Sequence, residues 1–279
     1  MSIMDRGAAA SSAPLRLVPD RPERPGATVT GLDDAVQITD VSKAFGRGST
    51  ALLALDKISL TVGRGEFVCL IGASGCGKST LLSLVAGLDR PTAGTVDTGA
   101  SKVALMFQEP ALFPWLTTAR NVELALRANG MGRAQRRQRT AELLDVVHLG
   151  SFAGKRPHEL SGGMRQRVAL ARALAQDADV LLMDEPFGAL DAMTRDLLHD
   201  ELDRICAGRG LTVLFVTHNV REAVRLGDRV VVLSSRPGRV IDEFKVPIQR
   251  PRRIDSAPVA ELASTITDRL REEMGRHGS

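Results

Sequence analysis

Short, wholly apolar runs alternate along the chain with longer segments in which apolar residues recur at helical spacing. A wholly apolar run is typical of a strand that is buried on both faces of a sheet. The sequence predicts such strands at residues 67–71, 103–107 and 180–183, and similar ones at 212–216 and 229–233, where only the first residue is polar. Apolar and polar residues alternate more strictly at residues 36–45 and 58–62, which predicts two half-buried strands.

Segments with helical spacing lie between most of these strands. They span residues 78–88, 118–129, 134–148, 163–175, 193–207 and 219–226, and a last amphipathic segment covers 259–274. Strands that alternate with helices predict an α/β fold with a mostly parallel sheet. The two early strands have no helix between them, so we expect an antiparallel β portion beside that sheet.

The pattern also suggests how the chain is divided. Residues 1–34 are rich in Ala, Pro, Ser and Arg, a composition that predicts a disordered N-terminal segment, or lead. Residues 35–245 form the predicted α/β domain, and residues 246–279 a tail that ends in a surface helix. Within the domain, residues 109–175 contain helical patterns without a convincing strand, which predicts an inserted helical subdomain.

Composition narrows the class of protein. Hydrophobic residues make up 43% of the 279 positions and charged residues 25%, as in soluble globular proteins. We find no secretory signal and no apolar stretch of the ~18–20 residues that a membrane crossing requires. The three cysteines suggest reduced thiols and no disulfide framework. The net charge of +4 is modest, and no basic stripe is interleaved with aromatic residues, so we expect no nucleic-acid partner.

A glycine-rich loop separates the buried strand at 67–71 from the helix that follows it. Its sequence, GASGCGKST at residues 72–80, matches the phosphate-loop pattern with Gly72, Gly77, Lys78 and Ser79 in place. Glycines allow backbone N–H groups to converge on phosphate oxygens, and the helix N-terminus faces the anion. Lys78 supplies a positive charge to the outer phosphates, and the Ser79 hydroxyl is a ligand for Mg²⁺.

An acidic pair, Asp184 and Glu185, follows the buried strand at 180–183. An acidic pair after a strand is equally often a simple helix N-cap. Here it follows a phosphate loop by about a hundred residues, which favours a nucleotide site. Asp184 would then hold Mg²⁺, and Glu185 would orient and polarise an attacking water.

A second place for an anion lies at residues 161–163, Ser-Gly-Gly, where an amphipathic helical pattern begins. Small residues at a helix N-terminus leave N–H groups open to an anion. The surrounding sequence, LSGGMRQR, resembles the signature of the ATP-binding-cassette (ABC) ATPases and lies just before the acidic strand, as in that family. The resemblance continues in family order over about residues 36–245, with Gln108 as the Q-loop glutamine, ALD at 189–191 as the D-loop and His218 as the switch histidine.

The resemblance implies an ATPase that uses ATP with Mg²⁺. It implies catalytic roles for Glu185, His218 and Gln108, and places Ser79, Gln108 and Asp184 at the metal. The implied nucleotide-binding residues are Phe45, Gly72, Ser74, Gly75, Gly77, Lys78, Ser79, Thr80, Ser161, Gly162, Gly163 and Asp191. Phe45 stands where the family often has a stacking tyrosine, and it keeps the aromatic face.

In this family two cassettes pack head to tail, and each signature closes over the phosphate loop of the other. The resemblance therefore implies a homodimer, or a dimer with a paralogous subunit. Four functions compete: importer subunit, exporter subunit, soluble translation factor, and chromosome or repair ATPase. We find no membrane span, one cassette and no long coiled coil between Gln108 and Ser161, which favours the ATPase subunit of an importer, with an exporter subunit or a non-transport ABC ATPase as the alternatives.

The segment at residues 109–122 resembles that of nitrate, sulfonate and taurine importers. In that family the groove beside Gln108 receives membrane subunits, and the apolar residues 113–116, which include Trp115, suggest such a docking surface. Trp115 could instead be a core residue of the helical subdomain. The implied partners are two transmembrane permease subunits and a periplasmic or lipid-anchored solute-binding protein, with the chain on the cytoplasmic side of the membrane. The resemblance leaves sulfonate, taurine and nitrate as equal candidates for the solute, and an importer of a thiamine precursor is a further option.

Overall fold

The computed structural model describes residues 34–46 and 51–277. The predicted lead lies outside these residues, except for Asp34, at which the first strand begins.

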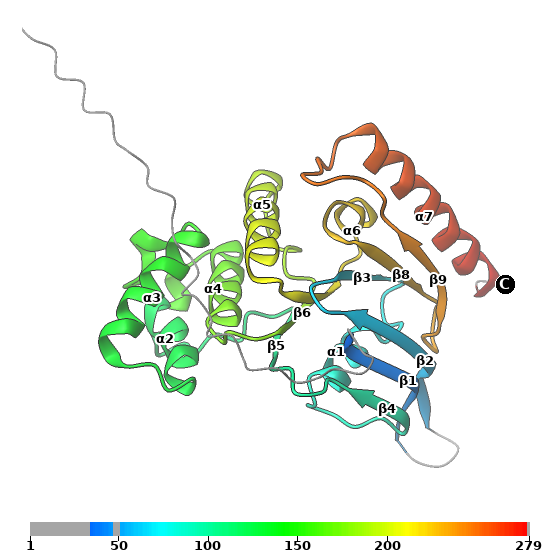
Figure 1. The fold of residues 1–279 in the computed structure, drawn as a ribbon, viewed down its shortest axis with the longest axis horizontal. Coiled ribbons are helices and arrows are strands. Elements are labelled where there is room, and N and C mark those ends of the chain that lie inside the picture. Colours follow the sequence, from blue (N-terminus) through cyan, green and yellow to red (C-terminus); the bar gives the residue numbers. More distant parts are fainter. Residues whose placement is uncertain (1–33, 47–50, 278–279) are drawn as a thin grey trace, which may run out of the picture. The chain divides into compact units, whose positions relative to one another are not determined.

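A six-stranded sheet forms the centre of the described part (Figure 1), with the strand order β5-β6-β7-β3-β8-β9. Its strands are β3 (Phe67–Ile71), β5 (Val103–Met106), β6 (Val180–Asp184), β7 (Thr212–Val216), β8 (Arg229–Leu233) and β9 (Val240–Lys245). All neighbours pair in parallel except β8 and β9, which are antiparallel. Every residue of β3, β6 and β7 is buried, which explains why these strands are wholly apolar runs apart from Thr212 and Asp184 at strand ends.

A second, antiparallel sheet has the order β2-β1-β4 and consists of β1 (Asp34–Phe45), β2 (Leu52–Gly63) and β4 (Ala93–Asp97). Helix α1 (Lys78–Val85) contacts strands of both sheets. Leu81, Leu82, Leu84 and Val85 of this helix share one hydrophobic core with residues of both sheets. The predicted α/β fold with an antiparallel portion is therefore confirmed.

The chain between β5 and β6 is described throughout and contains helices without a strand. They are α2 (Thr118–Ala128), α3 (Arg133–Val146), the short 3₁₀ helices Gly150–Phe152 and Pro157–Glu159, and α4 (Gly162–Leu174). Figure 1 shows α2, α3 and α4 gathered together, and α4 also contacts the edge strand β5. Helix α4 therefore links this helical group to the sheet.

The remaining helices are α5 (Ala192–Arg209), α6 (Val220–Leu226) and α7 (Ala257–His277). Helix α7 packs on α6 and buries Val259, Ala263 and Ile266, as expected for an amphipathic surface helix. Within the described residues, none of the helices combines the length and hydropathy that a membrane crossing needs.

Some predicted boundaries were wrong. The strand predicted at 58–62 extends over Leu52–Gly63, and the helix predicted at 78–88 ends at Val85. Strands β4 and β9 were not predicted. Both contain exposed positions and lack the continuous apolar run that marked the buried strands, because each lies at the edge of its sheet.

Candidate active site

Polar side chains gather at one edge of the six-stranded sheet. Strands β3, β5, β6 and β7 are parallel, so their carboxyl ends meet at the same edge. The glycine-rich loop follows β3, Gln108 follows β5, Asp184 ends β6 and Glu185 comes directly after it. His218 comes two residues after β7. This edge is where ligands bind in open α/β sheets.

Gly77 fixes the turn from the loop into α1. Its φ of 100° is strained for residues with a side chain, and a Cβ there would lie 2.5 Å from Leu55 Cδ2. Helix α1 starts at the next residue, and no side chain caps its N-terminus. Its first N–H groups are therefore available to an anion.

The Lys78 side chain is folded into the loop that precedes it. Its ammonium donates hydrogen bonds to the carbonyl oxygens of Gly72 and Ala73 at 2.8 and 2.9 Å, and only 7% of Lys78 is exposed. These bonds satisfy a buried cation, which would otherwise be costly. The positive charge is thus held at the centre of the loop.

Arg236 is a contact of the same loop that the sequence analysis missed. Its guanidinium donates to the Gly75 carbonyl through Nε at 3.1 Å and Nη2 at 3.0 Å. Strand β8 is parallel to β3, so Arg236, three residues beyond β8, also reaches this edge. Its position after a fifth buried strand was the available signal.

Asp184 is 8% exposed and lies close to the Ser79 side chain. Burial raises the pKa of Asp184, and the Ser79 hydroxyl partly opposes this effect. A carboxylate and a hydroxyl side by side are oxygen donors of the kind that Mg²⁺ prefers. Mg²⁺ commonly takes only one or two protein carboxylates. The donor set therefore fits Mg²⁺, although the described residues contain no cluster of three His, Cys, Asp or Glu residues suited to a metal.

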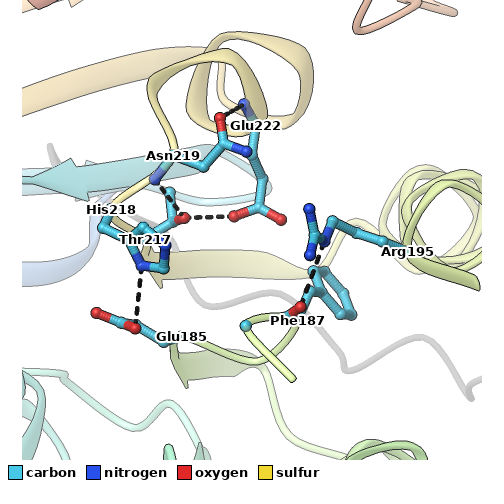
Figure 2. Close-up of a pocket in the computed structure, with 8 residues that line it drawn as sticks. Glu185, Phe187, Arg195, Thr217, His218, Asn219 and Glu222 are labelled. Atoms are coloured by element: carbon cyan, nitrogen blue, oxygen red, sulfur yellow. Dashed lines mark hydrogen bonds and ion pairs between the residues drawn. The ribbon is translucent and has the colours of Figure 1, made fainter. Parts of the chain in front are cut away.

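Glu185 turns its carboxylate toward two other predicted site residues. His218 Nδ1 lies 3.1 Å from Glu185 Oε2, as Figure 2 shows, and Gln108 Nε2 donates to the same oxygen at 3.4 Å. The φ of Glu185 is 45°, a left-handed conformation that is uncommon for residues other than glycine. The side chain of His218 is 68% exposed, so this group of three is open to a ligand.

The signature residues lie at the start of α4. Ser161 is the N-cap, and its Oγ accepts a hydrogen bond from the Met164 N–H at 3.2 Å. A Cβ at Gly163 would lie 3.0 Å from Leu190 Cδ2, so this glycine packs directly on the D-loop. Asp191 caps α5 by accepting from the Thr194 N–H, and this bond lowers the pKa of Asp191.

The two predicted phosphate sites are separate within one chain. Among the hydrogen bonds of the described residues, none joins the loop at 72–80 to residues 161–163. The signature helix instead holds the segment that follows β5. Gln166 Nε2 donates to the Gln108 carbonyl at 3.2 Å, and Arg172 donates to the Pro110 and Ala111 carbonyls, each at 2.8 Å.

Two of the predicted site residues are aromatic side chains exposed at the surface, Phe45 and Trp115. Phe45 is 45% exposed, and the Lys43 ammonium stands 5.2 Å from the centroid of its ring. Trp115 is 68% exposed, and its ring centroid lies 5.5 Å from that of Phe113. The alternative that Trp115 is a core residue is therefore wrong.

The fold and this edge define a P-loop nucleotide-binding protein of the α/β class. The family model described as ABC transporter matches residues 55–188. An aliphatic sulfonates import ATP-binding protein (SsuB 1) of Mesorhizobium japonicum is 48% identical over 89% of this chain and 93% of its own length. The nitrate import ATP-binding protein NrtD of Synechocystis sp. is 46% identical over 76% of this chain and 82% of its own.

A solved structure of MJ0796, described as a dimeric bacterial ABC transporter cassette, covers 77% of this chain and all of its own at 35% identity, with a TM-score of 0.71. The chain therefore belongs to the ABC transporter family and is one of its ATP-binding proteins.

Proposed function

We propose that the chain is the ATP-hydrolysing subunit of an ABC importer for small anionic solutes such as aliphatic sulfonates, taurine or nitrate. The observation that carries the ATPase is the convergence of Glu185, His218 and Gln108 at the sheet edge where the phosphate loop also lies. The import of anions is supported by relatives that are named as import proteins for sulfonates and nitrate. A taurine import protein of Burkholderia pseudomallei, 46% identical over 75% of this chain and 84% of its own, supports it as well.

In the proposed reaction, water attacks the γ-phosphorus of ATP, and the bond from that phosphorus to the β–γ bridging oxygen breaks. Glu185 accepts the proton that the attacking water loses. His218 and Gln108, both within hydrogen-bond range of Glu185 Oε2, orient this carboxylate and the γ-phosphate end of the substrate. Lys78 and the N–H groups at the start of α1 bind the phosphates and stabilise the charge that develops on them.

Ser79, Asp184 and Gln108 would hold Mg²⁺, which neutralises charge on the phosphate oxygens when it is bound. The closeness of Ser79 and Asp184 supports this assignment, because it brings two suitable oxygen donors together. Burial and the neighbouring charge of Glu185 raise the pKa of Asp184, whereas Ser79 and Lys78 act in the opposite direction and favour the ionised form that a metal needs.

The remaining nucleotide contacts would come from both subunits of a dimer. Phe45 would stack on adenine with the ring face opposite Lys43, while Ser74, Gly75 and Thr80 complete the phosphate loop. Ser161, Gly162 and Gly163 would face the γ-phosphate in the partner's loop. The Ser161 oxygen accepts the Met164 N–H, which leaves its own O–H to donate to a phosphate oxygen. Asp191, at the D-loop packed against Gly163, would lie at the same interface.

The exposed Phe113 and Trp115 pair supports a docking surface for the two membrane subunits, which would place the chain at the cytoplasmic face of a membrane. The backbone just before this pair is tied to the signature helix through Arg172. Movement of the docked segment would therefore reach the nucleotide site directly.

The ATPase is tested by Glu185→Gln. The amide cannot accept a proton, so we expect turnover to fall by at least about a hundredfold while MgATP still binds. A complex that closes but cannot react should accumulate as an ATP-bound dimer. Glu142→Gln, which changes a carboxylate on α3 paired with Arg139, is the matched control and should hydrolyse ATP at the parental rate. If Glu185→Gln hydrolysed ATP at the parental rate, Glu185 would not be the general base.

Import is tested separately in proteoliposomes that contain the chain, its membrane subunits and the solute-binding protein. Taurine, an alkanesulfonate or nitrate should stimulate ATP hydrolysis and enter the vesicles. Stimulation by none of the three would reject the proposed class of solutes and leave the ATPase assignment intact.

A further inference from the structure

Glu222 is a buried acid that the proposed chemistry does not use. It lies in the first turn of α6 and is 4% exposed. Its Oε2 accepts a hydrogen bond from the Thr217 hydroxyl, and its Oε1 lies 2.8 Å from Nε2 of His199. Both oxygens therefore have partners, as a buried carboxylate requires.

His199, on α5, is completely buried and connects Glu222 to a cation. Its Nδ1 lies 2.7 Å from Nη1 of Arg225, which can only donate, so Nδ1 is the acceptor and Nε2 carries the proton toward Glu222. Arg225 is held in turn by Asp196 at 3.0 Å and Asp200 at 2.6 Å. A continuous series of hydrogen bonds thus runs from α5 to Glu222.

The series ends at the two neighbours of His218. Thr217 Oγ1 donates to Glu222 and accepts the N–H of Asn219 at 3.0 Å, as Figure 2 shows. Asn219 is the N-cap of α6, and its side chain accepts the N–H groups of Arg221 and Glu222. In an ordinary capping box the acid at 222 would itself bond the N–H at 219. Here the Thr217 hydroxyl is inserted between them and fixes the backbone on both sides of His218.

Helix α5 also holds the segment after β6, which contains Glu185. Arg195 donates to the Phe187 carbonyl at 3.3 Å, and the Phe187 ring meets the edge of His199 with a centroid separation of 5.0 Å. Phe187 and Arg195 line a pocket together with Glu185 and His218. Figure 2 shows Phe187 and Arg195 on one side of the pocket and the Thr217–Glu222 bond on the other. One helix thus contacts the supports of both Glu185 and His218.

We propose that Thr217, Glu222 and His199 are positioning residues that hold His218 against Glu185. The inference rests on the proposed function, because it concerns the same reaction. The His218 side chain is 68% exposed, so its place depends on the backbone that carries it. A displacement of about 1 Å in a reacting group can reduce turnover about a hundredfold.

The test compares Thr217→Val, which keeps the shape and removes the hydroxyl, with Thr217→Ser, which keeps the hydroxyl. We expect Thr217→Val to lower kcat by about tenfold to a hundredfold with KM and the dissociation constant for ATP within about twofold of the parent. Thr217→Ser should recover most of the lost turnover. Thr118→Val is the matched control, because the buried Thr118 hydroxyl donates to the Lys155 carbonyl in the helical group. It should leave kcat unchanged.

A double-mutant cycle shows whether Thr217 acts through His218. Once His218→Ala has removed the imidazole, Thr217→Val should cause no further loss of kcat. An equal loss in both backgrounds, or a Thr217→Val variant with parental kcat, would overturn the inference. His218→Ala with parental kcat would instead reject the proposed role of His218 itself, so the two failures are distinguishable.

If Thr217→Val does not fold, two variants of His199 test the same proposal. In His199→Gln, the amide can donate to Glu222 and accept from Arg225 as the imidazole does, whereas His199→Leu can do neither. We expect near-parental kcat for His199→Gln and the reduced kcat for His199→Leu, with ATP binding unchanged in both. Equal kcat values in the two variants would contradict the proposal.

Discussion

Asp191 is a single residue with one observed role, as a helix cap, and one proposed role, at the nucleotide site. Its carboxylate caps α5 by accepting the Thr194 N–H, and the proposed dimer also places it near the nucleotide. A negative charge at a helix N-terminus is favourable. The cap therefore stabilises the ionised form and lowers the pKa of Asp191 in the folded chain.

This lowered pKa has a measurable consequence for stability. A carboxyl with a lower pKa in the folded chain stabilises the fold above its unfolded pKa of about 3.9, and this contribution is lost as pH falls through the folded value. Asp191→Asn keeps the cap and removes the charge, so it should melt below the parent at pH 7. The difference should disappear under acidic conditions. A difference that persists at pH values below the lowered pKa would show that charge is not the cause.

Individual site residues were predicted from the sequence to different degrees. The loop, the acidic pair, Gln108 and His218 could be placed because each follows an apolar strand, and parallel strands end at one edge. Their roles stay predictions until variants are measured. His199, which supports the backbone around His218, and Arg236, which contacts the phosphate loop, were missed because their partners are distant in sequence. His199 contacts Glu222 across 23 positions, and Arg236 contacts Gly75 across 161. Asn219 and Glu222 at capping-box spacing were a local signal, but they predict a different bond.

At the scale of elements, the two adjacent glycines at the start of α4, Gly162 and Gly163, differ in how closely other side chains approach them. A Cβ at Gly162 would have its nearest neighbour, Arg165 Nη2, at 3.9 Å, whereas a Cβ at Gly163 would press on Leu190 at 3.0 Å. Alanine is favoured over glycine in a helix by up to about 1 kcal/mol.

Gly162→Ala should therefore match or exceed the parent in the free energy of unfolding. Gly163→Ala should fall below Gly162→Ala, because part of the same gain is lost when Leu190 and the D-loop shift. Urea unfolding of the two variants, with equal m-values, provides the comparison. Equal free energies of unfolding for the two variants would show that the contact between Gly163 and the D-loop adapts to the added methyl group without a loss of stability.

The segment between β5 and α2 carries the second prediction at this scale. Trp115 is 68% exposed, so Trp115→Ala should leave the melting temperature within about 2 °C of the parent, as surface changes usually do. Binding to the membrane subunits should weaken by at least tenfold, in the range of about 1.4 kcal/mol or more for an aromatic contact at an interface. Leu88→Ala, at an apolar side chain that is 62% exposed, is the control and should bind normally. A lowered melting temperature with normal binding would contradict the docking role.

The elements themselves were predictable where burial is complete. Strands β3, β6 and β7 are buried along their whole length, so their sequences are apolar and easily located. The edge strands β4 and β9 escaped because their pairing depends on backbone hydrogen bonds to β1 and β8, which leave a weak pattern in the side chains. The long antiparallel pairing of β1 and β2 likewise extended β2 beyond its alternating centre.

At the scale of the whole molecule, one chain contains two predicted phosphate-binding elements, and no hydrogen bond of the described residues joins them. The loop at 72–80 lies at the sheet edge, whereas Ser161 and its two glycines begin a helix of the helical group. The solved cassette structures to which this chain is similar are described as dimeric, one of them bound to ADP and phosphate. We therefore propose that each ATP site is completed by the signature of a second chain.

The most direct test mixes two variants that both carry Glu185→Gln, so that a closed site retains its ATP. One also carries Lys78→Ala, which damages the phosphate loop. The other carries Gly162→Asp, which sets a negative charge against the γ-phosphate. At a few ångströms this repulsion is worth several kcal/mol at an intermediate effective dielectric. Neither variant should trap ATP alone. In a mixed dimer with signatures acting across the interface, one site unites both lesions and the other is intact.

We therefore expect one trapped ATP per mixed dimer, so that the total amount of trapped ATP follows the fraction of mixed dimers. If each signature served its own chain, both sites of the mixed dimer would carry a lesion. No trapped ATP at any ratio, with mixed dimers demonstrated by cross-linking, would contradict the claim.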